Sequence, residues 1–245
     1  MNSEIRNPSG ERLDYSFHDA GPDARALVII GHGVTGNKDR PWDVALGETL
    51  AANGCHALRF SFAGNGDSEG DFRNSTVTKE VADLGAVLDA AHAAGYSNIV
   101  YAGHSMGGAV GVLRTASDNR IQSLISLAGM VHTAKFAQVE FGDATPDQGF
   151  MWEDEDCPLS STFVDDMNAV DSVLDRAPQI HVPWLLVHGT TDDVVPIEES
   201  REIFAQANEP KTLVELPGVG HVFADDGLQP MLQAVTTWLG KALAP

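Results

Sequence analysis

Short runs of apolar residues recur along the whole chain and alternate with segments of helical spacing. A short, continuous apolar run bounded by turn residues is typical of a strand buried on both faces of a sheet. The predicted strands are Ala26–Ile30, His56–Phe62, Asn98–Ala102, Ser123–Ala128, Trp184–Val187 and Thr212–Leu216. Strands that alternate with helices predict an α/β fold, in which a mainly parallel sheet carries helices on both faces.

Between these runs, apolar residues repeat every three or four positions, as they do on one face of a helix. The predicted helices are Asp43–Asn53, Thr78–Ala94, Ala109–Thr115, Glu198–Ala207 and Leu228–Leu243. The N-terminal segments Glu4–Arg6 and Leu13–His18 are polar and are flanked by glycine or proline. We expect these two segments to form an antiparallel hairpin at the edge of the sheet.

Residues 131–178 interrupt the alternation, because they contain no clear strand. The segment is rich in acidic residues and in aromatic ones, among them Phe136, Phe141, Phe150, Trp152 and Phe163. A structureless loop of this length is improbable in a compact domain. We therefore expect an inserted cap over the sheet, with 1–130 and 179–245 forming the core. The aromatic rings either pack the cap onto the core or line an apolar acyl or aryl pocket.

The composition excludes several classes of function. The formal net charge of −20 repels nucleic acid phosphates, so no nucleic acid partner is expected. The N-terminus lacks the pattern of a secretory signal and no apolar stretch reaches the length of a membrane span, which favours a cytoplasmic protein without membrane contact. Cys55 and Cys157 form neither a disulfide framework nor a metal-binding pair. We expect no metal and no cofactor.

Gly103-His104-Ser105-Met106-Gly107 lies between the predicted strand Asn98–Ala102 and the predicted helix Ala109–Thr115. This is the G-x-S-x-G pattern in the strand–turn–helix context that a nucleophile elbow requires. The flanking glycines allow a tight turn that projects the Ser105 hydroxyl above the sheet. The following helix places its N-terminus beside the serine, where it favours developing negative charge. Ser105 is thus the candidate nucleophile.

A serine hydroxyl needs a base, and the base needs an acid to orient it. In the chain order serine, acid, histidine, the base is His221, which lies in the glycine-containing loop that follows the last predicted strand. The other histidines after Ser105 are His132, His181 and His188. The acid is Asp192 or Asp193, because both directly follow the strand Trp184–Val187.

The oxyanion of the tetrahedral intermediate needs two backbone N–H donors. One is the amide of Met106, the residue after the nucleophile. The other is expected from the loop after Ala26–Ile30, where the Val34 amide is the best candidate. The side chain of His32 in the same loop is expected to brace the loop rather than to catalyse.

These motifs together resemble those of the α/β-hydrolase superfamily, in the order in which the family carries them. The matching segments are HGVTGNKD (32–39), LRFSFAGNGDSEG (58–70), GHSMGG (103–108), HGTTDDVVP (188–196) and GVGH (218–221). The resemblance implies an α/β-hydrolase fold, places the acid on Asp192 and supports Val34 as an oxyanion donor. Within the superfamily the chain is similar to small bacterial carboxylesterases, including cinnamoyl or feruloyl esterases, and to a serine-aminopeptidase-like group. It departs from those esterases at Ser61, where they usually carry aspartate, and at Asn65, where histidine is common.

The sequence therefore predicts a serine carboxylesterase that hydrolyses small acyl or aryl esters, hydroxycinnamoyl esters included, through an acyl-enzyme. The expected partner is a small-molecule ester. An amidase or aminopeptidase with the same Ser105–His221–Asp192 triad is an alternative. A ligand receptor that turns over slowly is a third possibility from a different class of protein.

Overall fold

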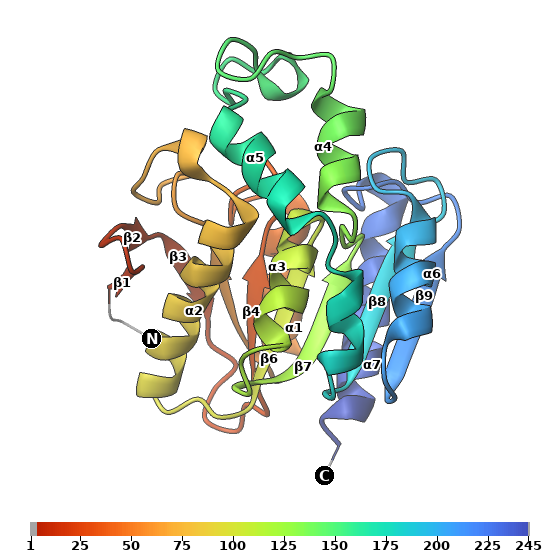
Figure 1. Cartoon of the computed structure of the whole chain (residues 1–245). Coiled ribbons are helices and arrows are strands. Elements are labelled where there is room, and N and C mark those ends of the chain that lie inside the picture. The colour runs from red at the N-terminus through yellow and green to blue at the C-terminus, as the bar shows by residue number, and fades with distance from the viewer. Residues whose placement is uncertain (1–3, 245) are drawn as a thin grey trace.

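The computed structural model describes residues 4–244 and is built around a seven-stranded sheet (Figure 1). The strands lie in the order β3-β5-β4-β6-β7-β8-β9, and all pairs are parallel except β3 with β5. Their bounds are β3 (Tyr15–His18), β4 (Leu27–Gly31), β5 (His56–Phe60), β6 (Ile99–His104), β7 (Ile121–Leu127), β8 (Trp184–Gly189) and β9 (Lys211–Leu216). The α/β class predicted from the alternation of strands and helices is confirmed.

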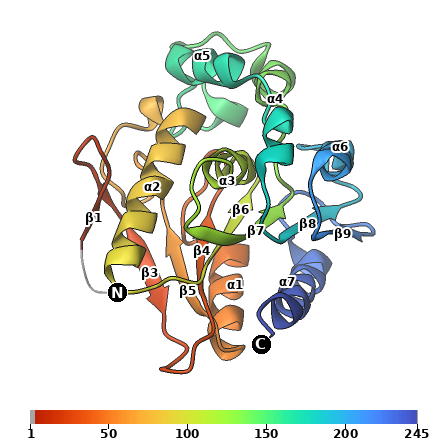
Figure 2. The same ribbon diagram turned by 60° about the horizontal axis from the view of Figure 1, so that its bottom comes forward.

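Helices cover both faces of this sheet, and each face buries its own apolar core (Figure 2). One face is covered by α1 (Pro41–Ala52) and α7 (Leu228–Ala242), and the other by α2 (Val77–Ala93), α3 (Met106–Thr115) and α6 (Ile197–Gln206). Successive residues of β4 alternate between the two cores, with Val28 and Ile30 on one side and Leu27 and Ile29 on the other. A strand buried on both faces has no polar positions, which explains its continuous apolar run.

The prediction that the N-terminal segments form a hairpin at the edge of the main sheet is wrong, because the segments belong to two different sheets. β1 (Ile5–Arg6) and β2 (Arg12–Leu13) pair antiparallel, but they form a separate two-stranded sheet. Only β3 joins the main sheet, as its antiparallel edge strand beside β5. The separation occurs at Asp14, whose carbonyl accepts a hydrogen bond from the Ser61 amide and whose amide donates to the Ser68 hydroxyl. Because Asp14 bonds to the loop after β5, the chain leaves one sheet before it enters the other.

Residues 131–178 contain α4 (Thr133–Phe141), η2 (Met151–Glu153), α5 (Ser161–Val170) and most of η3 (Leu174–Gln179). α4 and α5 pack against each other above the carboxyl ends of the strands (Figure 1), whereas η3 packs against α3 and α6 of the core. Phe136, Phe141 and Phe163 are buried, with their rings in edge-to-face contact. These three rings therefore pack the segment together. Trp152, which is 45% exposed, lies at the edge of this group, with its ring in edge-to-face contact with Phe141 and Phe136.

None of the helices within residues 4–244 combines the length and the apolar character needed to cross a bilayer.

Two buried carboxyl groups on α2 lie beside the loop that follows β5. Asp83 accepts hydrogen bonds from the Ala63 amide at 2.9 Å and from the Asn7 side chain at 2.7 Å, and it thereby ties the loop to the helix. Glu80 accepts one bond, from the Ser75 hydroxyl at 3.1 Å, while its other oxygen has no hydrogen-bond partner among residues 4–244. Burial, together with the nearby charge of Asp83, raises the pKa of Glu80 well above its usual value.

We predict that Glu80→Gln stabilises the protein at neutral pH. In the unfolded chain the Glu80 carboxyl ionises above about pH 4.5, whereas its raised pKa in the folded chain opposes ionisation there, so folding stability falls as pH rises above 4.5. The glutamine variant lacks this loss, which amounts to at most about 1.4 kcal/mol per pH unit. Urea unfolding at pH 4.5 and pH 7 should show an advantage of the variant that grows with pH. Glu155→Gln, which removes an exposed carboxyl, is the control, and equal pH trends in the two variants would contradict the prediction.

Candidate active site

Ser105 occupies a strained turn between β6 and α3. Its backbone has φ 52° and ψ −120°, a region that costs a residue with a side chain about 1–3 kcal/mol. Surrounding hydrogen bonds hold the turn in place, because the Ser105 amide donates to the Leu127 carbonyl at 3.0 Å. The Ser105 carbonyl accepts from the amides of Gly108 at 2.8 Å and Met130 at 3.0 Å. β7 and the segment after it therefore fix the geometry of the predicted nucleophile.

Glycines allow three backbone segments to meet at this turn. A Cβ atom on Gly103 would lie 2.1 Å from the Gly107 carbonyl oxygen, and one on Gly107 would lie 2.5 Å from the His32 carbonyl oxygen. A Cβ atom on Gly33 would lie 2.7 Å from the Ser105 Cβ. The loop after β4 thus lies directly against the serine, which is where the predicted donor Val34 has to be.

Asp192 and His221 are brought together by loops that follow neighbouring strands, β8 and β9. The two side chains form a hydrogen bond of 2.8 Å between His221 Nδ1 and Asp192 Oδ2. The other carboxylate oxygen of Asp192 accepts from the amides of Val194 at 3.0 Å and Val195 at 2.9 Å. Asp193, the alternative acid, is exposed. The geometry therefore pairs His221 with Asp192.

Sequence reasoning missed the second histidine that contacts Asp192. His188 is fully buried, and its Nε2 lies 3.1 Å from Asp192 Oδ2 and 2.9 Å from the Val195 carbonyl oxygen. Its Nδ1 lies 2.7 Å from the Ser200 hydroxyl, while its Nε2 faces two acceptors, Asp192 and the Val195 carbonyl, and therefore carries a proton. The sequence signal that could have indicated this contact is the spacing of the two residues, since His188 precedes Asp192 by four positions and lies near the end of β8.

The environment of Asp192 favours its charged form. Burial opposes ionisation of the carboxyl, but hydrogen bonds from His188 and His221 outweigh it and hold its pKa well below the usual value. Asp192 is therefore an anion throughout the neutral pH range. The permanent negative charge of Asp192 beside His221 Nδ1 favours the tautomer with its proton on Nδ1, which leaves Nε2 free for proton transfer.

Two further histidines brace the loops of the site. His104 Nε2 lies 2.9 Å from the His221 carbonyl oxygen, and burial lowers the pKa of His104 to about 3. His32 accepts from the Phe62 amide at 3.1 Å and its Nδ1 lies 2.8 Å from the Gly33 carbonyl oxygen. Burial lowers the pKa of His32 to about 4. Both rings are neutral at pH 7, and the bracing role expected for His32 agrees with its contacts.

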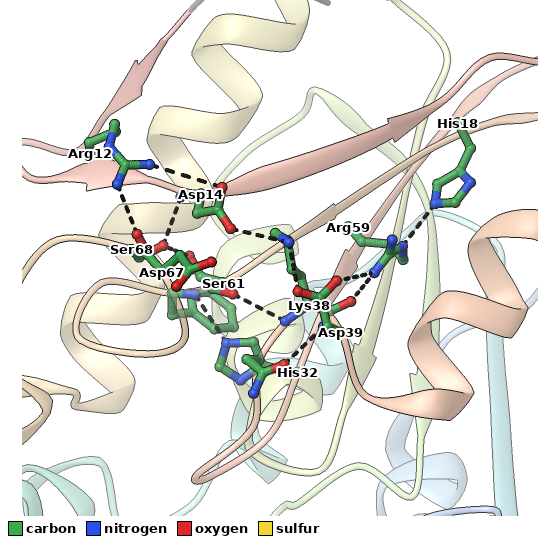
Figure 3. Close-up of polar contacts among 12 residues, drawn as sticks. Arg12, Asp14, His18, His32, Lys38, Asp39, Arg59, Ser61, Asp67 and Ser68 are labelled. Carbon is green, nitrogen blue, oxygen red and sulfur yellow. Dashed lines mark hydrogen bonds and ion pairs between the residues drawn. The ribbon is translucent and has the colours of Figure 1, made fainter. Parts of the chain in front are cut away.

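Buried polar contacts also anchor the far end of the loop that begins at His32 (Figure 3). Arg59, on β5, donates to the Lys38 carbonyl, to Asp39 and to His18 Nε2. The hydroxyl of Ser61 accepts from the Lys38 amide at 3.1 Å. Ser61, one of the two residues at which the chain departs from the esterase pattern, therefore holds this loop by a direct hydrogen bond.

A cavity of about 650 Å³ opens at this site. Ser105, His221 and Val34 lie on its wall, whereas Met106 is buried and does not line it. Most of the remaining wall comes from the loop after β4, the start of α1 and the segment that follows His221. The other lining residues are His32, Gly33, Thr35, Gly36, Arg40, Pro41, Trp42, His104, Trp152, Val194, Val222, Phe223, Ala224, Asp225 and Leu228. The structure thus brings Ser105, His221 and Val34 to one cavity, which Asp192 reaches through its hydrogen bond to His221.

The profile of the family described as serine aminopeptidase S33 matches residues 22–145 and 156–226, most of the chain. The chain belongs to this S33 family. The family pattern skips 146–155, the stretch of the 131–178 segment that contains Trp152. Family membership confirms the resemblance to α/β-hydrolases and makes the chain a hydrolase of that superfamily.

Solved structures support the same fold for this S33 member. Est1E from Butyrivibrio proteoclasticus, solved with ferulic acid bound, is 28% identical, with a TM-score of 0.89 over 99% of this chain and 100% of its own. An esterase of Pyrococcus furiosus, PF2001, shares the fold at 22% identity and a TM-score of 0.78, over 99% of this chain and 90% of its own. The uncharacterised Mycobacterium tuberculosis protein Rv2307c is 26% identical over 89% of this chain and 70% of its own length. The predicted α/β-hydrolase fold is confirmed.

We predict that Gly103→Ala destabilises the fold, because the added methyl group would lie 2.1 Å from a backbone oxygen that cannot move without displacing α3. Overpacking of this kind costs about 1–3 kcal/mol. Urea unfolding measures the loss. Gly240→Ala is the control, since a Cβ atom there meets nothing within 4 Å. A Gly103→Ala protein as stable as this control would show that the turn is not tightly packed.

Proposed function

We propose that this chain is a serine carboxylesterase that hydrolyses small acyl or aryl esters, with Ser105, His221 and Asp192 as its catalytic triad. The observation that carries the proposal is the hydrogen bond between His221 and an ionised, buried Asp192 on the edge of the cavity that Ser105 lines. This arrangement supplies a nucleophile, a base and an orienting acid in one place.

In the first half of the reaction, His221 Nε2 takes the proton of the Ser105 hydroxyl as its oxygen attacks the ester carbonyl. The Asp192 anion stabilises the imidazolium that forms, and it does not itself take the proton. The tetrahedral intermediate then collapses, the carbon–oxygen bond to the alcohol breaks, and His221 passes the proton that it took from Ser105 to the departing alcohol. An acyl group remains on Ser105.

The negative charge of the intermediate falls on the former carbonyl oxygen, which the amides of Met106 and Val34 stabilise. Met106 is the first residue of α3, where a helix leaves its N–H groups without internal acceptors. Val34 follows Gly33, whose backbone lies against the serine. The brace formed by His32 keeps this loop in place between turnovers, so that the donors need little reorganisation.

Deacylation repeats the same steps with water as the nucleophile, which His221 activates. Asp192 keeps one orientation in both halves because its carboxylate is held by His188 and by the amides of Val194 and Val195. His221 takes a proton from the attacking water and gives it to Ser105 Oγ as the bond between the acyl carbon and that oxygen breaks, which releases the acid and restores the serine hydroxyl.

The substrate class follows from the cavity wall and from the relative that binds an aromatic acid. Rings and aliphatic groups from Val34, Trp42, Trp152, Phe223 and Leu228 line the cavity. Ferulic acid, bound by Est1E, is an aryl acid, which supports aryl esters as substrates. Residues 131–178 act as a cap in this proposal, because they contribute Trp152 to the wall above the core formed by 1–130 and 179–245.

We predict that Ser105→Ala lowers kcat for p-nitrophenyl acetate and methyl ferulate about 10⁴-fold or more, because the triad acts as a unit. Wild-type enzyme should release a burst of p-nitrophenol equal to the enzyme concentration, and the variant should release none. Undiminished turnover by the variant would exclude the proposed nucleophile. A p-nitroanilide of the same acyl group, measured in parallel, distinguishes an esterase from an amidase with the same triad.

Adjacent aspartates allow a matched test of the acid. Asp192→Asn should lower kcat about 10⁴-fold, because the neutral amide no longer selects the productive His221 tautomer. Asp193→Asn removes the same charge one residue away and should retain activity, since that side chain is exposed. Steady-state kinetics on one ester suffices. Equal losses in the two variants would show that only the charge of the loop matters.

A further inference from the structure

The cavity wall carries a cation that the proposed mechanism does not use. Arg40 precedes α1 and lines the same cavity as Ser105 and Trp42. In the described part of the chain, no other arginine or lysine lines this cavity. The Arg40 guanidinium is held at one point, where Nη2 donates to the Thr35 carbonyl at 2.8 Å.

The remaining donors of Arg40 have no acceptor among residues 4–244. The chain contains 35 acidic and 15 basic residues, and most of its arginines lie within 4.0 Å of a carboxylate. Arg40 lies within that distance of none, although Asp225 lines the same cavity. A guanidinium has five N–H donors in a planar fork that matches the two oxygens of a carboxylate.

The segment that carries Arg40 is held firmly. Its carbonyl accepts from the amides of Asp43 and Val44 at the start of α1, both at 3.0 Å. The preceding residues Lys38 and Asp39 are fixed by the buried Arg59. Arg40 thus projects from a fixed backbone and keeps its position relative to Ser105, which a group that reads the far end of a substrate requires.

We propose that Arg40 binds an anionic carboxylate on the substrate, so that the preferred substrates are esters that carry a second, free carboxyl group. The inference rests on the proposed esterase function and names its substrate class. A net charge of −20 repels such a substrate at long range, and a local guanidinium supplies the attraction that the overall field does not. Hydrolysis of the ester bond proceeds as described above, and the distal carboxylate takes no part in the chemistry.

The test compares isosteric substrates that differ in charge. Monoethyl adipate carries a carboxylate, and its amide counterpart, ethyl adipamate, carries a neutral group of nearly the same shape. Shorter and longer half-esters, from succinate to suberate, are measured as well to match the span from Ser105 to Arg40. For each pair, the ratio of kcat/KM for the acid to that for the amide is determined by ethanol release. We expect Arg40→Gln to lower this ratio about tenfold for the best chain length. A change of about this size is typical for the loss of one charge-assisted hydrogen bond.

Arg25 is the matched control. It is also exposed, forms no ion pair within residues 4–244 and donates to one backbone carbonyl, that of Asn53, but it does not line the cavity. Arg25→Gln changes the net charge equally and should leave the ratio unchanged. Arg40→Lys, which keeps the charge but loses the planar fork, should fall between the wild type and Arg40→Gln.

Three results would overturn the inference. One is an unchanged ratio in Arg40→Gln. Another is an equal loss for acid and amide, which would make Arg40 a brace for the Thr35 loop. The last is a comparable change in Arg25→Gln, which would reflect the overall field. All three results are compared with the hydrolysis of the neutral substrate, ethyl adipamate, by the wild-type enzyme. If that hydrolysis persists in Ser105→Ala, the proposed function fails instead.

Discussion

The close approach of three backbone segments around Ser105 is the constraint on which the rest of this molecule depends. The end of β6, the start of α3 and the loop after β4 meet where no Cβ atom fits at Gly103, Gly107 or Gly33. The strain of the Ser105 backbone persists because hydrogen bonds from β7 and from the segment after it fix both ends of the turn. Packing of the core thus holds Ser105, the proposed nucleophile, in a conformation that a free peptide would not adopt.

Buried histidines connect the loops around this turn. His32, His104 and His188 each form hydrogen bonds to a backbone or side-chain atom of a neighbouring loop. Burial disfavours a charge on such rings, and for His32 and His104 it lowers the pKa well below neutrality. The neutral rings of His32 and His104 can therefore both donate and accept near pH 7, which suits them to join backbone segments. In the proposed mechanism, only His221 changes its protonation state.

Two charged side chains of the site, Asp192 and Arg40, differ in how their hydrogen-bonding capacity is satisfied. Asp192 is an anion because its carboxylate accepts from two histidines and two backbone amides. Arg40, by contrast, is a cation on the cavity wall with most of its donors unused within the described residues. One charge is satisfied inside the protein and orients the base, while the other faces the space that a substrate fills. The two together relate the proposed chemistry to the proposed substrate class.

The sequence by itself determined the order of the strands along the chain and the position of the turn that carries Ser105, the proposed nucleophile, since apolar runs and a G-x-S-x-G turn are local features that act over a few residues. It narrowed the acid to Asp192 and Asp193, and a family pattern was needed to choose between them. Only the tertiary structure decided which side chains meet: the second contact of His188 with Asp192, the separate sheet formed by β1 and β2, and the place of Trp152 and Arg40 on the cavity wall. Contacts between distant segments depend on how helices and loops pack across the sheet, and no local period in the sequence records that packing.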